Sequence, residues 1–155
     1  MKNIQRTPSH SLKRWRGQAL VEFALALPLV VFLVLGALEF GRAFQTKIVL
    51  ENAAREGVHN FIYDIDDASN SFNNTKAAVV AEAANSGVTI LSDKIVVQCF
   101  TDTNGNGSID SGEEDPGCDN GSTVDVTIIV DFDIAVIGPF TDPMPISSNA
   151  RMFIP

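Results

Sequence analysis

Oxygen-bearing side chains recur at regular spacing between residues 102 and 113. The stretch DTNGNGSIDSGE fits D-x-[DN]-x-[DN]-G, followed after five residues by Glu, which is the pattern of a calcium-binding loop. Calcium takes six to eight oxygen ligands, and such a loop supplies them from five side chains and one backbone carbonyl. The predicted ligands are Asp102, Asn104, Asn106, the Ser108 carbonyl, Asp110 and Glu113. We expect weak Ca²⁺ binding, because two of the side-chain ligands are neutral amides.

The surroundings of this loop differ from those of an EF-hand. A strand is expected before it, and Gly112 and Pro116 disfavour a helix after it. The sequence therefore predicts an EF-hand-like loop in a connection between strands. The alternative is an Asn- and Gly-rich turn that binds no metal.

Cys99 and Cys118 lie on either side of the loop. In an oxidising compartment, an even pair of cysteines in a small domain is most simply a disulfide. A closed loop of this size would stabilise the fold by about 3 kcal/mol. Two unpaired thiols are the alternative. A metal site is disfavoured, because neither a CxxC spacing nor a neighbouring His accompanies them.

A single carboxylate, Glu22, lies near the start of the apolar segment 19–38. About 20 apolar residues suffice to span a bilayer, and a carboxylate inside costs roughly 2.5–3.5 kcal/mol at the bilayer centre. Gly17 precedes Glu22 by five residues and follows a basic leader. With Phe23 next, this arrangement resembles the processing and assembly signal of type IV pilin-like proteins. The resemblance implies cleavage between Gly17 and Gln18, and a role for Glu22 and Phe23 in assembly.

Two other interpretations fit the same segment. It could be an uncleaved signal anchor, with Glu22 close enough to the headgroups to reach water. It could also be a secretory signal peptide cleaved near Gly36 and Ala37, although its apolar run exceeds the usual 7–15 residues.

Charge is distributed unevenly along the chain. Residues 1–17 carry five Lys or Arg and no acid, whereas the whole chain has a net charge of −8, so the remainder carries −13. Basic residues that flank a membrane segment stay in the cytoplasm, so the acidic part is expected outside. Nucleic acid is disfavoured as a partner, because phosphate binding requires clustered basic residues.

The periodicity predicts an α+β fold in three parts: a leader over 1–17, a helix over 18–59 that spans the membrane in its first half, and an outer domain over 60–155. We expect a loop over 64–74, a second helix over 76–86 that ends at Gly87, and strands near 93–100, 122–136 and 147–155. Pro28 should kink or loosen the first helix. An antiparallel sheet packed on a helix is the simplest arrangement, similar to a pilin.

Residues 16–58 together resemble the TadE-like family of tight-adherence (Flp) pilus assembly proteins. The matching elements are GQALVEFAL, Pro28, the EFGR exit at 39–42 and the NAAREG tail at 52–57. The resemblance implies a minor pilin or pseudopilin of a bacterial inner membrane, single-pass, with the N-terminus in the cytoplasm. It also implies contacts with the lipid bilayer, a prepilin peptidase and other apparatus subunits. Whether the chain enters a surface pilus is left open.

A different functional class also fits: a membrane-anchored, calcium-dependent adhesin or binding module at the cell surface. Catalysis is not expected, because the sequence contains no nucleophile motif and no Gly-rich phosphate loop.

Overall fold

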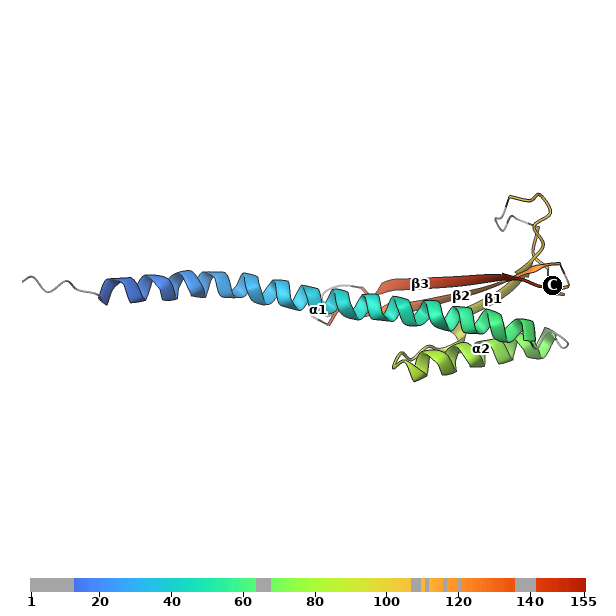
Figure 1. Cartoon of the computed structure of the whole chain (residues 1–155), viewed down its shortest axis with the longest axis horizontal. Helices are drawn as coiled ribbons and strands as arrows, with labels where there is room; N and C mark the ends of the chain where they lie inside the picture. The colour runs from blue at the N-terminus through green and yellow to red at the C-terminus, as the bar shows by residue number, and fades with distance from the viewer. Residues whose placement is uncertain are drawn as a thin grey trace, which may run out of the picture. The chain divides into compact units, whose positions relative to one another are not determined.

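The computed structural model describes residues 13–63, 68–106, 110, 112–115, 117–119, 121–135 and 142–155. Within them the chain forms two α-helices, a short 3-10 helix, η1 (Ser92–Lys94), and three strands, in the order α1, α2, η1, β1, β2, β3 (Figure 1). The strands form one antiparallel sheet. The expected α+β class, with a long N-terminal apolar helix and a second helix, is therefore confirmed. The chain divides into two compact units, Met1–Leu38 and Glu39–Pro155.

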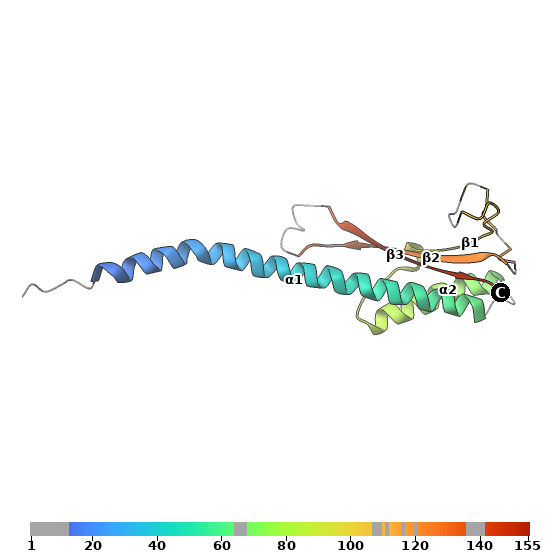
Figure 2. The same ribbon diagram turned by 45° about the horizontal axis from the view of Figure 1, so that its top comes forward.

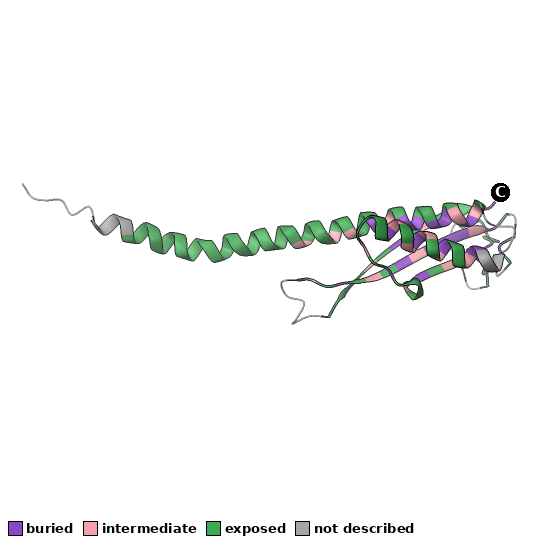
Figure 3. Ribbon diagram, turned by 90° about the horizontal axis from the view of Figure 1, so that it is seen from below, coloured by how far each residue is buried: buried purple, intermediate pink, exposed green. Residues whose placement is uncertain are grey.

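The first unit contains the start of α1, which spans Lys13–Tyr63. All residues from 17 to 38 are exposed, although most are apolar (Figure 3). Within the described residues, the chain has one helix long and apolar enough to cross a membrane, with a mean hydropathy of 2.5 in its most apolar window. The helix continues through Pro28. One N-terminal apolar helix of this kind is the signature of a membrane-anchored, single-pass protein.

In the second unit, the last third of α1 and α2 (Ala68–Asn85) lie on one face of the sheet (Figure 2). On α1 the buried positions recur every three or four residues, which places them on one side of the helix. This spacing is typical of a helix that packs on a sheet. The fully buried core residues are Leu50, Ala53, Ala54 and Phe61 of α1, Val79 and Ala83 of α2, and Val124, Val126 and Ile128 of β2.

Gly57 of α1 is approached by side chains of both α2 and β2. A Cβ atom there would lie 2.5 Å from Val79 Cγ2 and 3.4 Å from Val126 Cγ1. Real Cβ atoms do not approach other atoms to 2.5 Å, so α2 can pack this closely on α1 only because position 57 has no side chain.

The sheet has the order β1-β2-β3, formed by Ile95–Phe100, Thr123–Phe132 and Met144–Phe153. Side chains alternate along β2, so Val124, Val126 and Ile128 face the helices. β3 begins three residues earlier than expected and includes Pro145, which an edge strand tolerates because one of its sides lacks a partner.

α2 begins earlier than the sequence predicts. A loop was expected over 64–74: residues 64–67 lie outside the described residues, but residues 68–74 are helical, because α2 begins at Ala68. Its first turns are held by packing: the ring of Phe72 lies edge-on to Phe61, with centroids 5.3 Å apart, and Ser71 is buried. The helix ends as expected at Gly87, whose φ is +80°. There the Val88 N–H donates to the Ala83 carbonyl, closing the last turn.

Candidate functional site

A disulfide joins Cys99 of β1 to Cys118, with their Cα atoms 5.3 Å apart. This is the pairing that the sequence predicts, and it ties together the two ends of the acidic loop. The loop base has a second closure. The Thr101 N–H donates to the Glu113 carbonyl and the Asp115 N–H donates to the Cys99 carbonyl, both at 2.9 Å. The loop therefore extends β1 by a short antiparallel bridge.

Glu113, the twelfth residue of the calcium-like pattern, is buried inside this loop. Its Oε1 accepts hydrogen bonds from the Thr103 hydroxyl at 2.8 Å and the Thr103 N–H at 3.0 Å. Its Oε2 accepts one from the Asp110 N–H at 3.0 Å. The bonds from the Thr103 hydroxyl and from the Asp110 N–H hold the pKa of Glu113 below its ordinary value. Its side chain is therefore a carboxylate at neutral pH.

The other predicted ligands in the described part of the loop meet at two carboxylates. Asp110 Oδ2 accepts hydrogen bonds from the side-chain amides of Asn104 and Asn106, at 2.8 and 2.7 Å. Asp102 Oδ1 accepts bonds from the backbone N–H groups of Gly105 and Asn106, at 2.6 and 3.2 Å. Hydrogen bonds thus connect four of the six predicted ligands to one another. Glu113 is connected to them through its bond from the backbone N–H of Asp110.

The remaining ligand, Ser108, lies outside the described residues. In the part of the chain that the structure describes, no three His, Cys, Asp or Glu side chains are grouped closely enough to hold a metal ion. A calcium site here would therefore depend on Asn104 and Asn106 as well as on the carboxylates. Their side-chain amides, which donate to Asp110, would have to turn their oxygens inward to ligate a cation. Thr103 is a partner of Glu113 that the pattern does not reveal, because its position is a variable one.

The predicted processing and assembly residues lie on the first turns of α1. The Gln18 side-chain amide donates to Glu22 Oε1 at 3.0 Å, one helical turn away. Phe23 is 64% exposed. A Cβ at Gly17 would have no neighbour within 4 Å. This surface is accessible within the chain and includes both positions of the expected cleavage.

A buried carboxylate on the outer face of the sheet was not expected. Asp125 is only 5% exposed, and it accepts hydrogen bonds from Arg151 Nε and, at 2.8 Å, from the Thr127 hydroxyl. The Arg151 guanidinium lies over the Phe100 ring, 5.4 Å from its centroid. In the sequence, Asp125 is one of several polar residues that alternate with the apolar side of β2. The sequence signal that could have revealed this burial is Arg151, the basic residue of β3 that pairs with Asp125.

Comparison with curated proteins and with solved structures found no match to this chain. A comparison with protein families found one, and it falls on the long helix rather than on the acidic loop. Residues 17–59 match the family described as TadE-like protein.

Proposed function

We propose that this chain is a minor pilin- or pseudopilin-like membrane subunit of a tight-adherence pilus assembly and secretion apparatus. The observation that carries the proposal is the coincidence of two findings on one helix. The TadE-like match over residues 17–59 includes residues 17–38. All of these are exposed, and most of them are apolar or small. The role is structural rather than catalytic, as in the pilus-associated family that this segment resembles.

Charge supports an orientation in the bacterial inner membrane. The five basic residues of 1–17 favour a cytoplasmic N-terminus, and the acidic second unit is then extracytoplasmic. The disulfide agrees with this placement, because disulfides persist in oxidising compartments. The lipid bilayer, a prepilin peptidase and other subunits of the apparatus are the proposed partners.

Glu22 is proposed to act in assembly. A carboxylate inside an apolar segment is costly unless a positive group neutralises it, and a neighbouring subunit's amino terminus can do so. We expect Glu22→Ala to insert into the membrane at least as well as the parent chain but to co-purify poorly with the other apparatus subunits. Glu82→Ala, which removes the same group from α2, is the matched control. Undiminished co-purification of Glu22→Ala would refute the assembly role.

We also propose that the loop closed by Cys99 and Cys118 binds Ca²⁺ weakly, which would suit an adhesive or partner-binding surface. The supporting observation is that Asp110 holds both Asn104 and Asn106. Five described side chains would supply the oxygens: Asp102, Asn104, Asn106, Asp110 and Glu113.

Thermal unfolding of the full chain in detergent tests this binding. With a Kd of about 10⁻⁴–10⁻³ M, millimolar Ca²⁺ should stabilise the folded state by about 0.4–1.4 kcal/mol, a rise of a few degrees in Tm. Mg²⁺ should do less, because it demands a tighter octahedral geometry. Glu113→Gln should abolish the shift, whereas Glu114→Gln, which removes the same charge one residue later, should retain it. An equal shift in both variants would show that calcium acts elsewhere.

A further inference from the structure

One edge of the sheet is only partly paired among the described residues. The sheet order places β1 at an edge, where β2 is on one side and only the short bridge between Phe100 and Glu114 is on the other. The Cys99 carbonyl and the Thr101 N–H, which bond to residues 113–115, point away from β2. Because backbone groups along a strand alternate in direction, the N–H and C=O of Val97 and the C=O of Ile95 point the same way. These three groups lie before the Phe100–Glu114 bridge, where an extended segment can pair with them.

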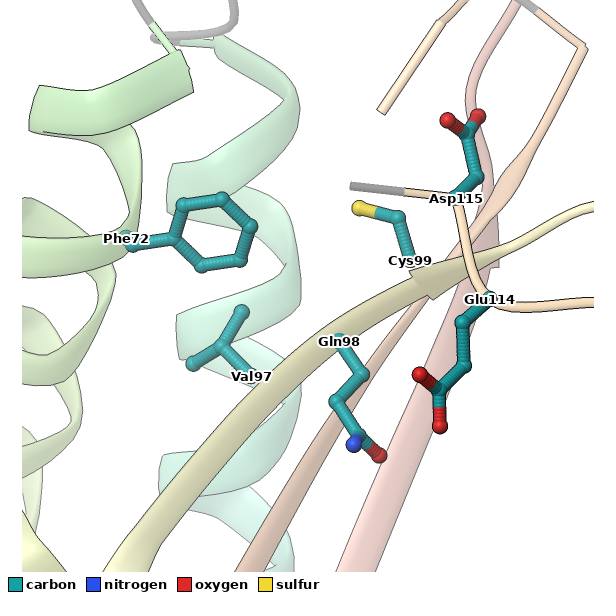
Figure 4. A pocket seen from close by; sticks show the side chains of 6 residues that line it. All are labelled: Phe72, Val97, Gln98, Cys99, Glu114 and Asp115. Carbon is teal, nitrogen blue, oxygen red and sulfur yellow. The ribbon is translucent and has the colours of Figure 1, made fainter. Parts of the chain in front are cut away.

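A pocket lies beside this open edge (Figure 4). Phe72 of α2 and Val97 lie on one side of β1, whereas Gln98 and Glu114 lie on the other. The ring of Phe72 is held by its edge-on contact with Phe61, so the apolar side is preformed. Side chains of a strand added here would alternate between the two sides of β1. One side chain would contact the apolar Phe72 and Val97, and the next would lie beside the polar Gln98 and the acidic Glu114.

Charge selects the kind of partner. From residue 95 to residue 150 the sequence has ten Asp and Glu and no Lys or Arg. Glu114 and Asp115 both line the pocket. A second copy of the same acidic unit would be repelled at this edge, whereas a basic segment would be attracted.

We propose that the open edge of β1 binds an extended segment of another protein, in which apolar and basic residues alternate, by addition of a strand to the sheet. The apolar residues contact Phe72 and Val97, and a basic residue pairs with Glu114. The backbone of the segment bonds to the Val97 N–H and C=O and to the Ile95 C=O. The proposal goes beyond the function proposed above, because it rests on residues outside the matched segment 17–59.

Two synthetic peptides test the proposal on the full chain in phosphatidylcholine nanodiscs. In one, valine and arginine alternate. In the other, glutamate replaces arginine. Fluorescence anisotropy should show binding of the arginine peptide and at least tenfold weaker binding of the glutamate peptide. Hydrogen exchange should slow at the Val97 amide when the arginine peptide binds. The Gln98 amide, which points to β2, should not change.

Variants separate the local edge from the overall acidity of the unit. Glu114→Lys should weaken binding of the arginine peptide about tenfold or more. Asp133→Lys, an identical charge change at an exposed position away from the pocket, should leave it nearly unchanged. Val97→Pro removes the outward N–H, which an edge strand tolerates, and should abolish binding while the melting temperature shows that the chain is folded.

Three results would overturn the proposal: equal binding of the two peptides, unchanged exchange at the Val97 amide, or equal weakening by Glu114→Lys and Asp133→Lys. The exchange measurement uses the parent chain, so it decides the matter even where Val97→Pro does not fold.

Discussion

At the scale of single residues, an ion pair links β2 to β3 on the outer face of the sheet. Asp125 is buried in β2, its register partner in β3 is Arg151, and the arginine is about 40% exposed over the Phe100 ring. A buried carboxylate is tolerated only where hydrogen bonds and a positive charge replace its water. The pair therefore fixes how β3 aligns with β2, because a slip of one residue would leave Asp125 without its partner.

We predict that Arg151→Gln destabilises the chain by about 1–3 kcal/mol, because it leaves the Asp125 carboxylate buried without its charge partner. Asp125→Asn combined with Arg151→Gln should recover part of the loss, since no buried charge remains. Urea unfolding of the single and double variants measures the coupling between the two side chains. Additive effects would show that the pair contributes nothing specific.

The sequence revealed residues whose chemistry is carried by a pattern. The Cys99–Cys118 pair followed from the position of two cysteines on either side of one short segment. Calcium binding by the pattern over 102–113 stays a prediction. The burial of Asp125 did not follow, because it depends on a residue 26 positions away in a strand whose register the sequence does not display. Local patterns predict local contacts, and pairing between distant strands requires the fold.

At the scale of elements, the packing of α2 on α1 depends on small residues along one side of α1. Ala53 and Ala54 are fully buried on this side, and Gly57 gives Val79 room to approach the helix backbone. The sequence predicted the α1 helix and the end of α2 well, because apolar periodicity and Gly87 are strong local signals. It missed the start of α2, since the Asn- and Ser-rich residues 68–75 have poor intrinsic helix propensity and become helical through tertiary contacts such as Phe72 on Phe61.

A pair of glycine substitutions tests this packing. We predict that Gly57→Ala destabilises the chain by about 1–3 kcal/mol, because the new methyl group would overlap Val79 and force the helices apart. Gly41→Ala is the matched control on the same helix: its Cβ would meet nothing within 4 Å, and alanine should stabilise the helix by about 0.5–1 kcal/mol. Thermal unfolding of both variants should show opposite shifts in Tm. A rise in Tm for Gly57→Ala would contradict the packing described here.

At the scale of the whole molecule, charge and hydrophobicity divide the chain into parts suited to different surroundings. The basic leader, the exposed apolar start of α1 and the acidic second unit follow one another along the sequence. A soluble protein would not leave so long an apolar segment exposed, since burial of such surface drives folding and association. The bilayer is the medium proposed to cover it, and the order of the charges predicts a cytoplasmic N-terminus.

Removal of the basic leader by a peptidase would change the charge order of the whole chain, and it can be tested directly. Cleavage between Gly17 and Gln18 would remove the basic residues and expose a new amino terminus one helical turn before Glu22, to which the Gln18 side chain already bonds. We predict that membrane-extracted protein begins at Gln18, as intact mass and N-terminal sequencing would show. Gly17→Val should block cleavage, because a small residue is needed at the scissile position. It should leave the fold intact, since a Cβ there has no neighbour within 4 Å. An N-terminus at Leu38 would instead indicate an ordinary signal peptide, and a retained leader would indicate an uncleaved anchor.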